Sequence, residues 1–295
     1  MAQAPGGELA GAVLVGAMWW YAGAVLYPAQ ALKRAGLSTI RPPVGAPPEP
    51  LARRGLGAYF SRRHKRPVLL EAPTLHDHLV GEFDRVAEVY DAYVQPFSQP
   101  IFDEALAEMR PYLPADGRVL DAGCGPGREL QRVANLVPEG EVVGVDLAGG
   151  MVNVAHRAAR ARGLDNCAFF QADVSHLPRE FTGKFDLIYS SLAHHHYPDP
   201  AAAAASAVRC LRPGGLYCVI DPGPAWYNVL SAPLARWADP GWVGFHTPDR
   251  FCALFRDAGF ARASWVELLP GFGLAIGQRA VRQGRATSSG ASLKG

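Results

Sequence analysis

The chain has 295 residues, of which 49% are hydrophobic and 19% charged, with a formal net charge of +2. This composition supports a sizeable core and excludes an intrinsically disordered protein. The five cysteines are dispersed, without a Cys-x-x-Cys pair or a Cys/His cluster, so we expect reduced thiols, no disulfide framework and no structural metal.

The first predicted element follows a short tail, residues 1–8. Residues 9–32 contain no Asp, Glu, Lys, Arg or His. As a helix this segment extends roughly 36 Å, more than the roughly 30 Å of a hydrocarbon core. Because the basic residues follow it, we expect a single-pass transmembrane helix with the rest of the protein in the cytoplasm. The alternatives are a cleaved signal peptide, a buried core helix and a helix lying flat at the membrane interface.

The next segment, residues 33–77, is rich in Pro, Gly and Arg and shows no sustained periodicity, which is typical of a linker. Between Lys33 and Arg66 there are nine basic residues and one acidic residue. Beside a membrane, such a cluster favours contact with anionic lipid headgroups. A solvated linker is the alternative, and we do not expect nucleic acid as a partner.

Residues 78–281 alternate helical stretches with short β-branched runs. The alternation predicts an α/β domain with a Rossmann-like, doubly wound, seven-stranded sheet. The last two strands are separated only by Pro270 and Gly271, so we expect an antiparallel C-terminal hairpin, followed by a disordered tail at 282–295. The strands are expected at 118–123, 141–147, 167–173, 185–191, 216–222, 261–269 and 272–280.

Polar residues stand where the first four predicted strands end: Asp121, Asp146, Asp173 and Ser190. In a parallel sheet these ends meet at one edge, where ligands bind. The run VLDAGCGPG at 119–127 has the spacing G-x-G-x-G with a carboxylate nearby, which differs from the dinucleotide fingerprint and is unfavourable for an anion. The pattern therefore favours a cationic ligand that lies against the backbone.

Five motifs in order carry a family resemblance: VLDAGCGPG, VVGVDLAGGMVNVAHRAA, FFQADVSHLP, FDLIYSSLAHHHYPDP and LRPGGLYCVID. The series resembles class I S-adenosylmethionine-dependent methyltransferases. The upstream run FDRVAEVYD and the downstream runs TPDRFCALFRDAGF and LLPGFGLAIGQR are similar to the branch that acts in ubiquinone and menaquinone biosynthesis. The resemblance covers about residues 78–280 and implies S-adenosylmethionine as the cofactor.

The resemblance also implies roles for individual residues. The glycines would hold the amino-acid end of the cofactor, Asp121 its amino group, Asp146 both ribose hydroxyls, and Met151, Asp173 and Val174 the adenine. Met151 as a core residue and Asp173 as a turn or capping residue are the structural alternatives. The implied cofactor-binding residues are Asp121, Gly123, Cys124, Gly125, Gly127, Asp146, Leu147, Met151, Asp173, Val174 and Ser190.

The run LAHHHYPDP matches a pattern of the relatives at His195 and His196, whereas His194 replaces an apolar residue. A histidine of ordinary pKa could remove a proton from the acceptor during methyl transfer, so these two are the candidate catalytic residues. The alternative is that His196 orders the loop and His194 is exposed to solvent.

The aromatic residues of segment 222–246 suggest an apolar pocket or lid. Together with the expected membrane helix they predict methyl transfer to a lipophilic small molecule (a quinone, isoprenoid or other lipid) at the cytoplasmic membrane face. The alternatives are a methyltransferase for a soluble natural-product intermediate and a noncatalytic, cofactor-binding membrane adaptor.

Overall fold

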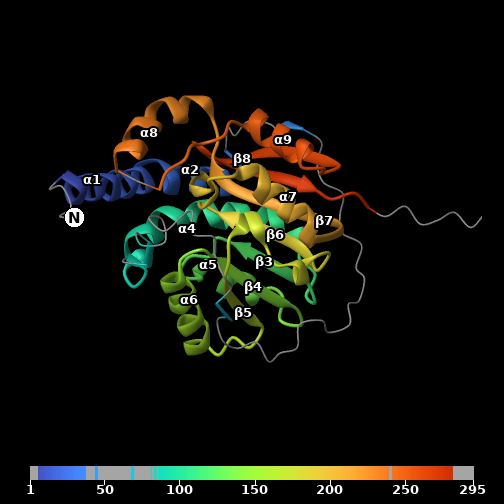
Figure 1. Cartoon of the computed structure of the whole chain (residues 1–295). Helices are drawn as coiled ribbons and strands as arrows, with labels where there is room; N and C mark the ends of the chain where they lie inside the picture. Colours follow the sequence, from blue (N-terminus) through green and yellow to red (C-terminus); the bar gives the residue numbers. More distant parts are fainter. Residues whose placement is uncertain are drawn as a thin grey trace, which may run out of the picture.

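The computed structural model describes residues 6–37, 44–45, 68–69, 81, 83–84, 86–238 and 241–281. Their centre is a mixed sheet with the strand order β1-β8-β9-β7-β6-β3-β4-β5-β2. Figure 1 shows the larger strands following one another from β8 at the top to β5 at the bottom. The strands are β1 (Val44–Gly45), β2 (Val68–Leu69), β3 (Arg118–Ala122), β4 (Glu141–Asp146), β5 (Cys167–Gln171), β6 (Phe185–Ser191), β7 (Leu211–Pro222), β8 (Arg262–Leu269) and β9 (Phe272–Gln278).

The seven predicted strands are present, so the predicted class of fold is confirmed. Strands β3 to β7 pair parallel with one another, and β9 pairs antiparallel with both β7 and β8. The predicted hairpin turns at Gly271, whose φ of 88° favours glycine. Strand β7 begins at Leu211 rather than at residue 216, because an irregularity opposite Phe185–Leu187 lets the pairing with β6 start earlier.

Helices cover both faces of the sheet, and successive strand residues point to opposite faces. Val119 contributes to the core under α4 and α5, whereas its neighbour Leu120 contributes to the core under α7 and α9. The helices are α1 (Gly6–Tyr21), α2 (Tyr27–Arg34), α4 (Tyr90–Met109), α5 (Arg128–Ala134), α6 (Gly149–Ala161), α7 (Pro200–Cys210), α8 (Ala225–Ala238) and α9 (Pro248–Asp257). One π-helical turn, η1 (Ala22–Leu26), and the 3₁₀ turns η3 (Arg110–Tyr112), η4 (Val174–His176), η5 (Arg179–Phe181) and η6 (His194–His196) complete the regular elements.

The N-terminal segment corrects one prediction. Within the described ranges, no helix has both the length and the apolar character that crossing a bilayer requires. The π-helical turn η1 divides the predicted span, residues 9–32, and Ala22 and Leu26 are fully buried in the core of the domain. Gln30 Nε2 donates to Pro100 O at 3.3 Å, and Lys33 pairs with Glu104 at 3.0 Å. The prediction of a transmembrane helix is therefore wrong: the uncharged run includes a face that packs on α4.

The predicted linker, residues 33–77, lies mostly outside the described residues, as do most of the predicted tail 1–8 and all of the predicted tail 282–295. Its described pieces include the two-residue strands β1 and β2. The first pairs with β8 and the second with β5, so they extend the sheet at its two edges.

Candidate active site

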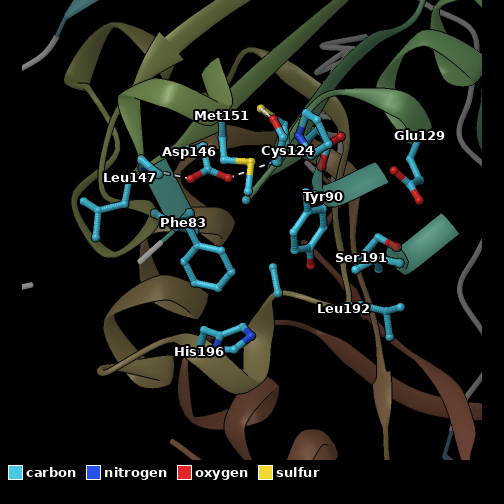
Figure 2. A pocket seen from close by; sticks show the side chains of 18 of the residues that line it. Phe83, Tyr90, Cys124, Glu129, Asp146, Leu147, Met151, Ser191, Leu192 and His196 are labelled. Carbon is cyan, nitrogen blue, oxygen red and sulfur yellow. Dashed lines mark hydrogen bonds between the residues drawn. The ribbon is translucent and has the colours of Figure 1, made fainter. Parts of the chain in front are cut away.

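A cavity lies at the carboxyl ends of β3 to β6, where the polar strand ends meet (Figure 2). It encloses about 1150 Å³, including its open mouth. Of the residues predicted to bind or react, ten line it; Gly127, Ser190 and His195 do not. The ten are Asp121, Gly123, Cys124, Gly125, Asp146, Leu147, Met151, Asp173, Val174 and His196.

The three glycines of the loop after β3 all have positive φ but serve different purposes. A Cβ on Gly123 would approach the Ala193 Cβ to 2.8 Å, and one on Gly127 would approach the Ala155 Cβ to 2.7 Å, so these two glycines permit close packing. A Cβ on Gly125 would meet no atom within 4 Å. Gly125 is therefore the glycine that leaves backbone open toward a ligand.

Asp146, at the end of β4, shapes this loop. Its Oδ2 accepts the Gly125 N–H at 2.8 Å, and its Oδ1 accepts the Ala148 N–H at 2.9 Å. Burial raises the pKa of the carboxyl, and these N–H groups act in the opposite direction. Because a carboxylate oxygen accepts more than one hydrogen bond, both oxygens keep capacity for hydroxyl donors in the cavity.

Asp121 is almost completely buried at the end of β3. Burial raises the pKa of its carboxyl well above the usual range, and the Tyr189 hydroxyl, which donates to Oδ2 at 2.7 Å, acts against the shift. A cation placed in the cavity would favour the ionised form. Asp121 is thus suited to an ammonium group, and sequence reasoning did not identify its partner Tyr189.

Asp173 has a capping role as well as a place in the cavity. Its Oδ1 accepts the Ser175 N–H at 2.8 Å at the start of η4, and its Oδ2 lies 3.2 Å from His176 Nδ1. Val174, next in the chain, also lines the cavity. Asp173 therefore caps η4, as the structural alternative proposed. It also lies in the cavity, at a position suitable for binding a purine.

Ser190 does not line the cavity but contacts a residue that does. Its hydroxyl lies 2.9 Å from Tyr197 Oη, which donates to Ala122 O at 2.7 Å. Tyr197 itself lines the cavity. Ser190 therefore holds the loop after β6 against the end of β3.

Several lining residues were not predicted individually. Phe83 and Tyr90 belong to the upstream run FDRVAEVYD, and their rings lie next to each other with centroids 6.3 Å apart (Figure 2). Glu129 stands in the first turn of α5, and Leu192 has a φ of 51°. Such a φ is uncommon outside glycine and marks the bend by which the chain leaves β6 for the histidines.

The three adjacent histidines occupy three environments. His194 is buried, its Nε2 has no hydrogen-bond partner among the residues that the structure describes, and its ring contacts Tyr197, His246 and Phe251. The alternative that His194 is exposed to solvent is wrong. His196 lines the cavity edge-on to the Phe83 ring, and burial lowers its pKa to about 3, so it stays neutral at physiological pH.

His195 is paired with a buried acid. Its Nδ1 lies 2.6 Å from Oδ1 of Asp221, which has no exposed surface and ends β7. Burial raises the pKa of Asp221, and the imidazole of His195 acts against that shift. Sequence reasoning missed Asp221, although the strand-end rule that identified Asp121 and Asp146 applies to it equally.

Aromatic rings that are not among the cavity-lining residues lie next to this pair. Phe245 lies 5.3 Å from the His195 ring, and Tyr227 of α8 lies 6.1 Å from Phe245. The Tyr227 ring also contacts Tyr21 at 6.1 Å and Phe272 at 5.1 Å, all between ring centroids. The aromatic segment after β7 and the N-terminal helix thus meet beside His195.

The residues fit the cofactor that the sequence resemblance implies. Gly125 leaves the loop backbone open, Asp121 and Asp146 offer acceptors for an ammonium and for hydroxyls, and Leu147 and Met151 provide apolar contact for a base. The site also contains acids without a facing Lys or Arg among its lining residues, which suits a positively charged ligand.

Comparisons with known proteins agree with this geometry. Residues 119–215 match the family described as a methyltransferase domain. Trans-aconitate 2-methyltransferase of Deinococcus radiodurans is 31% identical over 190 residues, which cover 62% of this chain and 67% of that protein. Nocamycin O-methyltransferase of Saccharothrix syringae is 36% identical over 48% of this chain and 50% of its own length. A ubiquinone biosynthesis O-methyltransferase of Ruegeria pomeroyi is 33% identical over 54% of this chain and 64% of that protein.

The chain spans from half to two thirds of the length of these relatives. Among solved structures, a SAM-dependent methyltransferase from Aquifex aeolicus has a TM-score of 0.51 at 18% identity, covering 68% of this chain and 97% of that one, which shows the shared fold. Fold, loop geometry and relatives lead to one conclusion: the chain belongs to the class I S-adenosylmethionine-dependent methyltransferases, with S-adenosylmethionine as its cofactor.

Proposed function

We propose that this enzyme transfers a methyl group to a hydroxyl oxygen of a lipophilic small molecule, with His195 as the general base. The observation that carries the proposal is the 2.6 Å contact between His195 Nδ1 and the buried Asp221 carboxylate. A carboxylate in this position fixes the ring orientation and stabilises the imidazolium that forms when the other ring nitrogen takes a proton. This pairing suits an alcohol or phenol, which loses its proton as it is methylated.

The cofactor supplies an activated methyl group, so the protein has to orient the acceptor and manage one proton. In the proposed mechanism Asp121 and Asp146 hold the cofactor, and His195 receives the acceptor proton on Nε2 while Asp221 holds Nδ1. His196 is the weaker candidate for the base, because its lowered pKa of about 3 makes it a poor proton acceptor. We assign His196 to positioning of the acceptor.

The aromatic surroundings of His195 support a lipophilic acceptor. Phe245 lies 5.3 Å from the His195 ring, and Tyr227 and Trp242 pack on Phe245. Aromatic walls of this kind suit apolar or aromatic molecules. Two of the relatives reported above are named as O-methyltransferases, one of nocamycin and one of ubiquinone biosynthesis. These names support oxygen as the methylated atom and leave both a quinone and a natural-product intermediate as acceptor classes.

The test combines product identification with two variants. The full chain is incubated with labelled S-adenosylmethionine and a panel of polar and lipophilic hydroxyl compounds, and the methylated atom is identified by mass spectrometry and NMR. We expect an O-methyl ether of a lipophilic compound. His195→Asn should lower kcat by about 10²- to 10⁴-fold with unchanged cofactor affinity, whereas His196→Asn should mainly raise KM for the acceptor.

Methylation only of polar acceptors would contradict the lipophilic part of the proposal. A His195→Asn variant with wild-type kcat would contradict the role of the base. Asp221→Asn tests the partner of His195. It should also lower kcat and should shift the pH dependence of kcat, because the amide cannot stabilise the imidazolium.

A further inference from the structure

The solvent-facing side of α8 is apolar over most of its length and ends at the exposed Arg236. Trp226, Val229, Leu230 and Pro233 follow one another at steps of three, one and three residues, which places them on one face of the helix, and all four are exposed. Val229 is 74% exposed and Leu230 is 73% exposed. An ordinary surface helix presents its polar face to water, so this orientation is the reverse of the expected one.

The N-terminal helix has a second face of this kind. Val13, Gly16, Ala17 and Trp20 repeat the same spacing along α1, and all four are exposed, Trp20 to 70%. The stripe continues beyond η1 to Tyr27, which is also exposed. The opposite side of this segment, with Ala22 and Leu26, is the side that packs into the core.

The two faces belong to one region. Helices α1 and α8 are in contact, and Figure 1 shows them together at the same end of the molecule. The Tyr21 and Tyr227 rings link them at 6.1 Å. We name this region the apolar surface and define it by Val13, Trp20, Tyr27, Trp226, Val229 and Leu230. Exposed apolar side chains gathered at one end of a molecule in this way mark an interaction site.

The charged residues on α8 and at the end of α2 are basic, and Lys33 and Arg34 are paired with Glu104 and Asp103 of α4. Helix α8 contains Arg236 and no acidic residue, and α2 ends with Lys33 and Arg34. The Arg34 side chain is 64% exposed. In the whole run from Gly6 to Arg34, Glu8 is the single acid. Tryptophan and tyrosine on an apolar face, with arginine and lysine at its end, is the composition of helices that lie in the headgroup region of a bilayer.

We propose that the apolar surface docks on a lipid bilayer with anionic headgroups, with α1 and α8 lying in its interface rather than crossing it. A protein partner is the less suitable occupant, because specific protein interfaces also carry hydrogen-bonding groups, and both stripes are built from Val, Leu, Gly, Ala, Pro and aromatic residues. A bilayer requires no such complementary partners.

The apolar surface borders the active site. Trp19 Nε1 donates to Tyr93 O at 3.0 Å, and Tyr90 and Val94, one turn or less away on α4, line the cofactor cavity. On the other side, Tyr227 of α8 connects through Phe245 to His195. A lipid-dissolved acceptor could therefore enter from the bilayer without crossing water; this route rests on the proposed function, whereas the docking does not.

The test measures docking without any acceptor. The full chain is sedimented with vesicles of phosphatidylcholine alone and of phosphatidylcholine with phosphatidylglycerol. We expect binding to both, stronger to the anionic vesicles, and quenching of tryptophan fluorescence by brominated lipid. The double variant Val229→Ser/Leu230→Ser should weaken partitioning by about tenfold or more, because two exposed side chains lose their apolar contact with lipid.

Val281→Ser is the matched control, since Val281 is 54% exposed and lies beyond β9, outside the apolar surface. It should bind vesicles like the wild type, and all variants should keep the wild-type melting temperature and cofactor affinity. Absence of vesicle binding by the wild type, or equal loss in Val281→Ser, would overturn the proposal. A concentration-dependent dimer that Val229→Ser/Leu230→Ser dissociates, without vesicle binding, would assign the surface to a second copy of the chain. Because no methyl transfer is measured, failure here is distinguishable from failure of the proposed function.

Discussion

The two sides of this active site are built on different principles. On the cofactor side, acids at strand ends and a glycine loop take their positions from backbone hydrogen bonds, as Asp146 does with the Gly125 and Ala148 N–H groups. On the side proposed for the acceptor, side-chain contacts between distant segments set the geometry: Tyr21 of α1, Tyr227 of α8 and Phe272 of β9 meet ring to ring. The first side can be inferred from local sequence, and the second depends on tertiary packing.

The comparison is tested first at the N-terminal helix. Leu26→Ala should lower the free energy of unfolding by about 2–5 kcal/mol, because it removes a fully buried side chain from the core shared with α4. Chemical denaturation measures the change. Leu32→Ala, at a side chain that is 51% exposed, is the control and should change stability by less than about 0.5 kcal/mol. Equal stability of Leu26→Ala and wild type would show that the segment is not part of the folded domain.

On the cofactor side, Asp146→Ala should weaken S-adenosylmethionine binding by about 100-fold, or about 2.7 kcal/mol, in calorimetric titration. The substitution removes acceptors for the ribose hydroxyls and releases the Gly125 N–H that shapes the loop. Asp257→Ala, at an exposed position of α9, should bind like the wild type. An unchanged affinity in Asp146→Ala would refute the assigned cofactor contacts.

The smallest expected effect concerns pH. Burial raises the pKa of Asp121, so ionisation of this carboxyl with rising pH should strengthen binding of the cationic cofactor, by up to about tenfold per pH unit. For the stability of the ligand-free protein the pH dependence has the opposite sign. Because the pKa of Asp121 is higher in the folded than in the unfolded protein, its contribution to the free energy of unfolding is complete below the unfolded pKa of about 3.9. This contribution is lost as the pH rises through the folded pKa.

Calorimetry in buffers of different ionisation enthalpy would detect the proton released on binding. Asp121→Asn should bind more weakly and with a flatter pH profile, and Tyr189→Phe should move the profile to higher pH, since it removes the hydroxyl that donates to the carboxylate. An identical pH profile in wild type and Asp121→Asn would contradict this account.

The sequence allowed the sheet and most of the cofactor cavity to be predicted, because period-two runs and strand-end polar residues are local signals. Asp121, Asp146 and Met151 all line the cavity as expected. Asp221 could have been found by the same rule, since it ends the next strand, but its partner His195 lies 26 positions away and only the fold brings the two together.

The N-terminal helix shows what hydropathy alone could not decide. Residues 9–32 lack charges because one face packs into the core and another, with Val13 and Trp20, is exposed and apolar. A count of charges treats these two faces alike and therefore favoured a membrane span. The distinguishing contact is made by one polar residue near the end of the run: the Gln30 side chain of α2 donates to Pro100 O of α4.

The contacts of the segment before α4 have a consequence for catalytic turnover. Phe83 and Tyr90 cover the cofactor cavity, and the neighbouring Asp84 accepts the Gly150 N–H at the start of α6 at 2.6 Å, while Glu88 pairs with Arg157 on the same helix. Both contacts are exposed, and surface ion pairs contribute little free energy. The segment is also packed on α6, because the buried Ala87 contacts Ala148 and Met151. Departure of spent S-adenosylhomocysteine past this segment would separate two exposed polar contacts and one small apolar cluster, while the two large cores of the sheet stay intact.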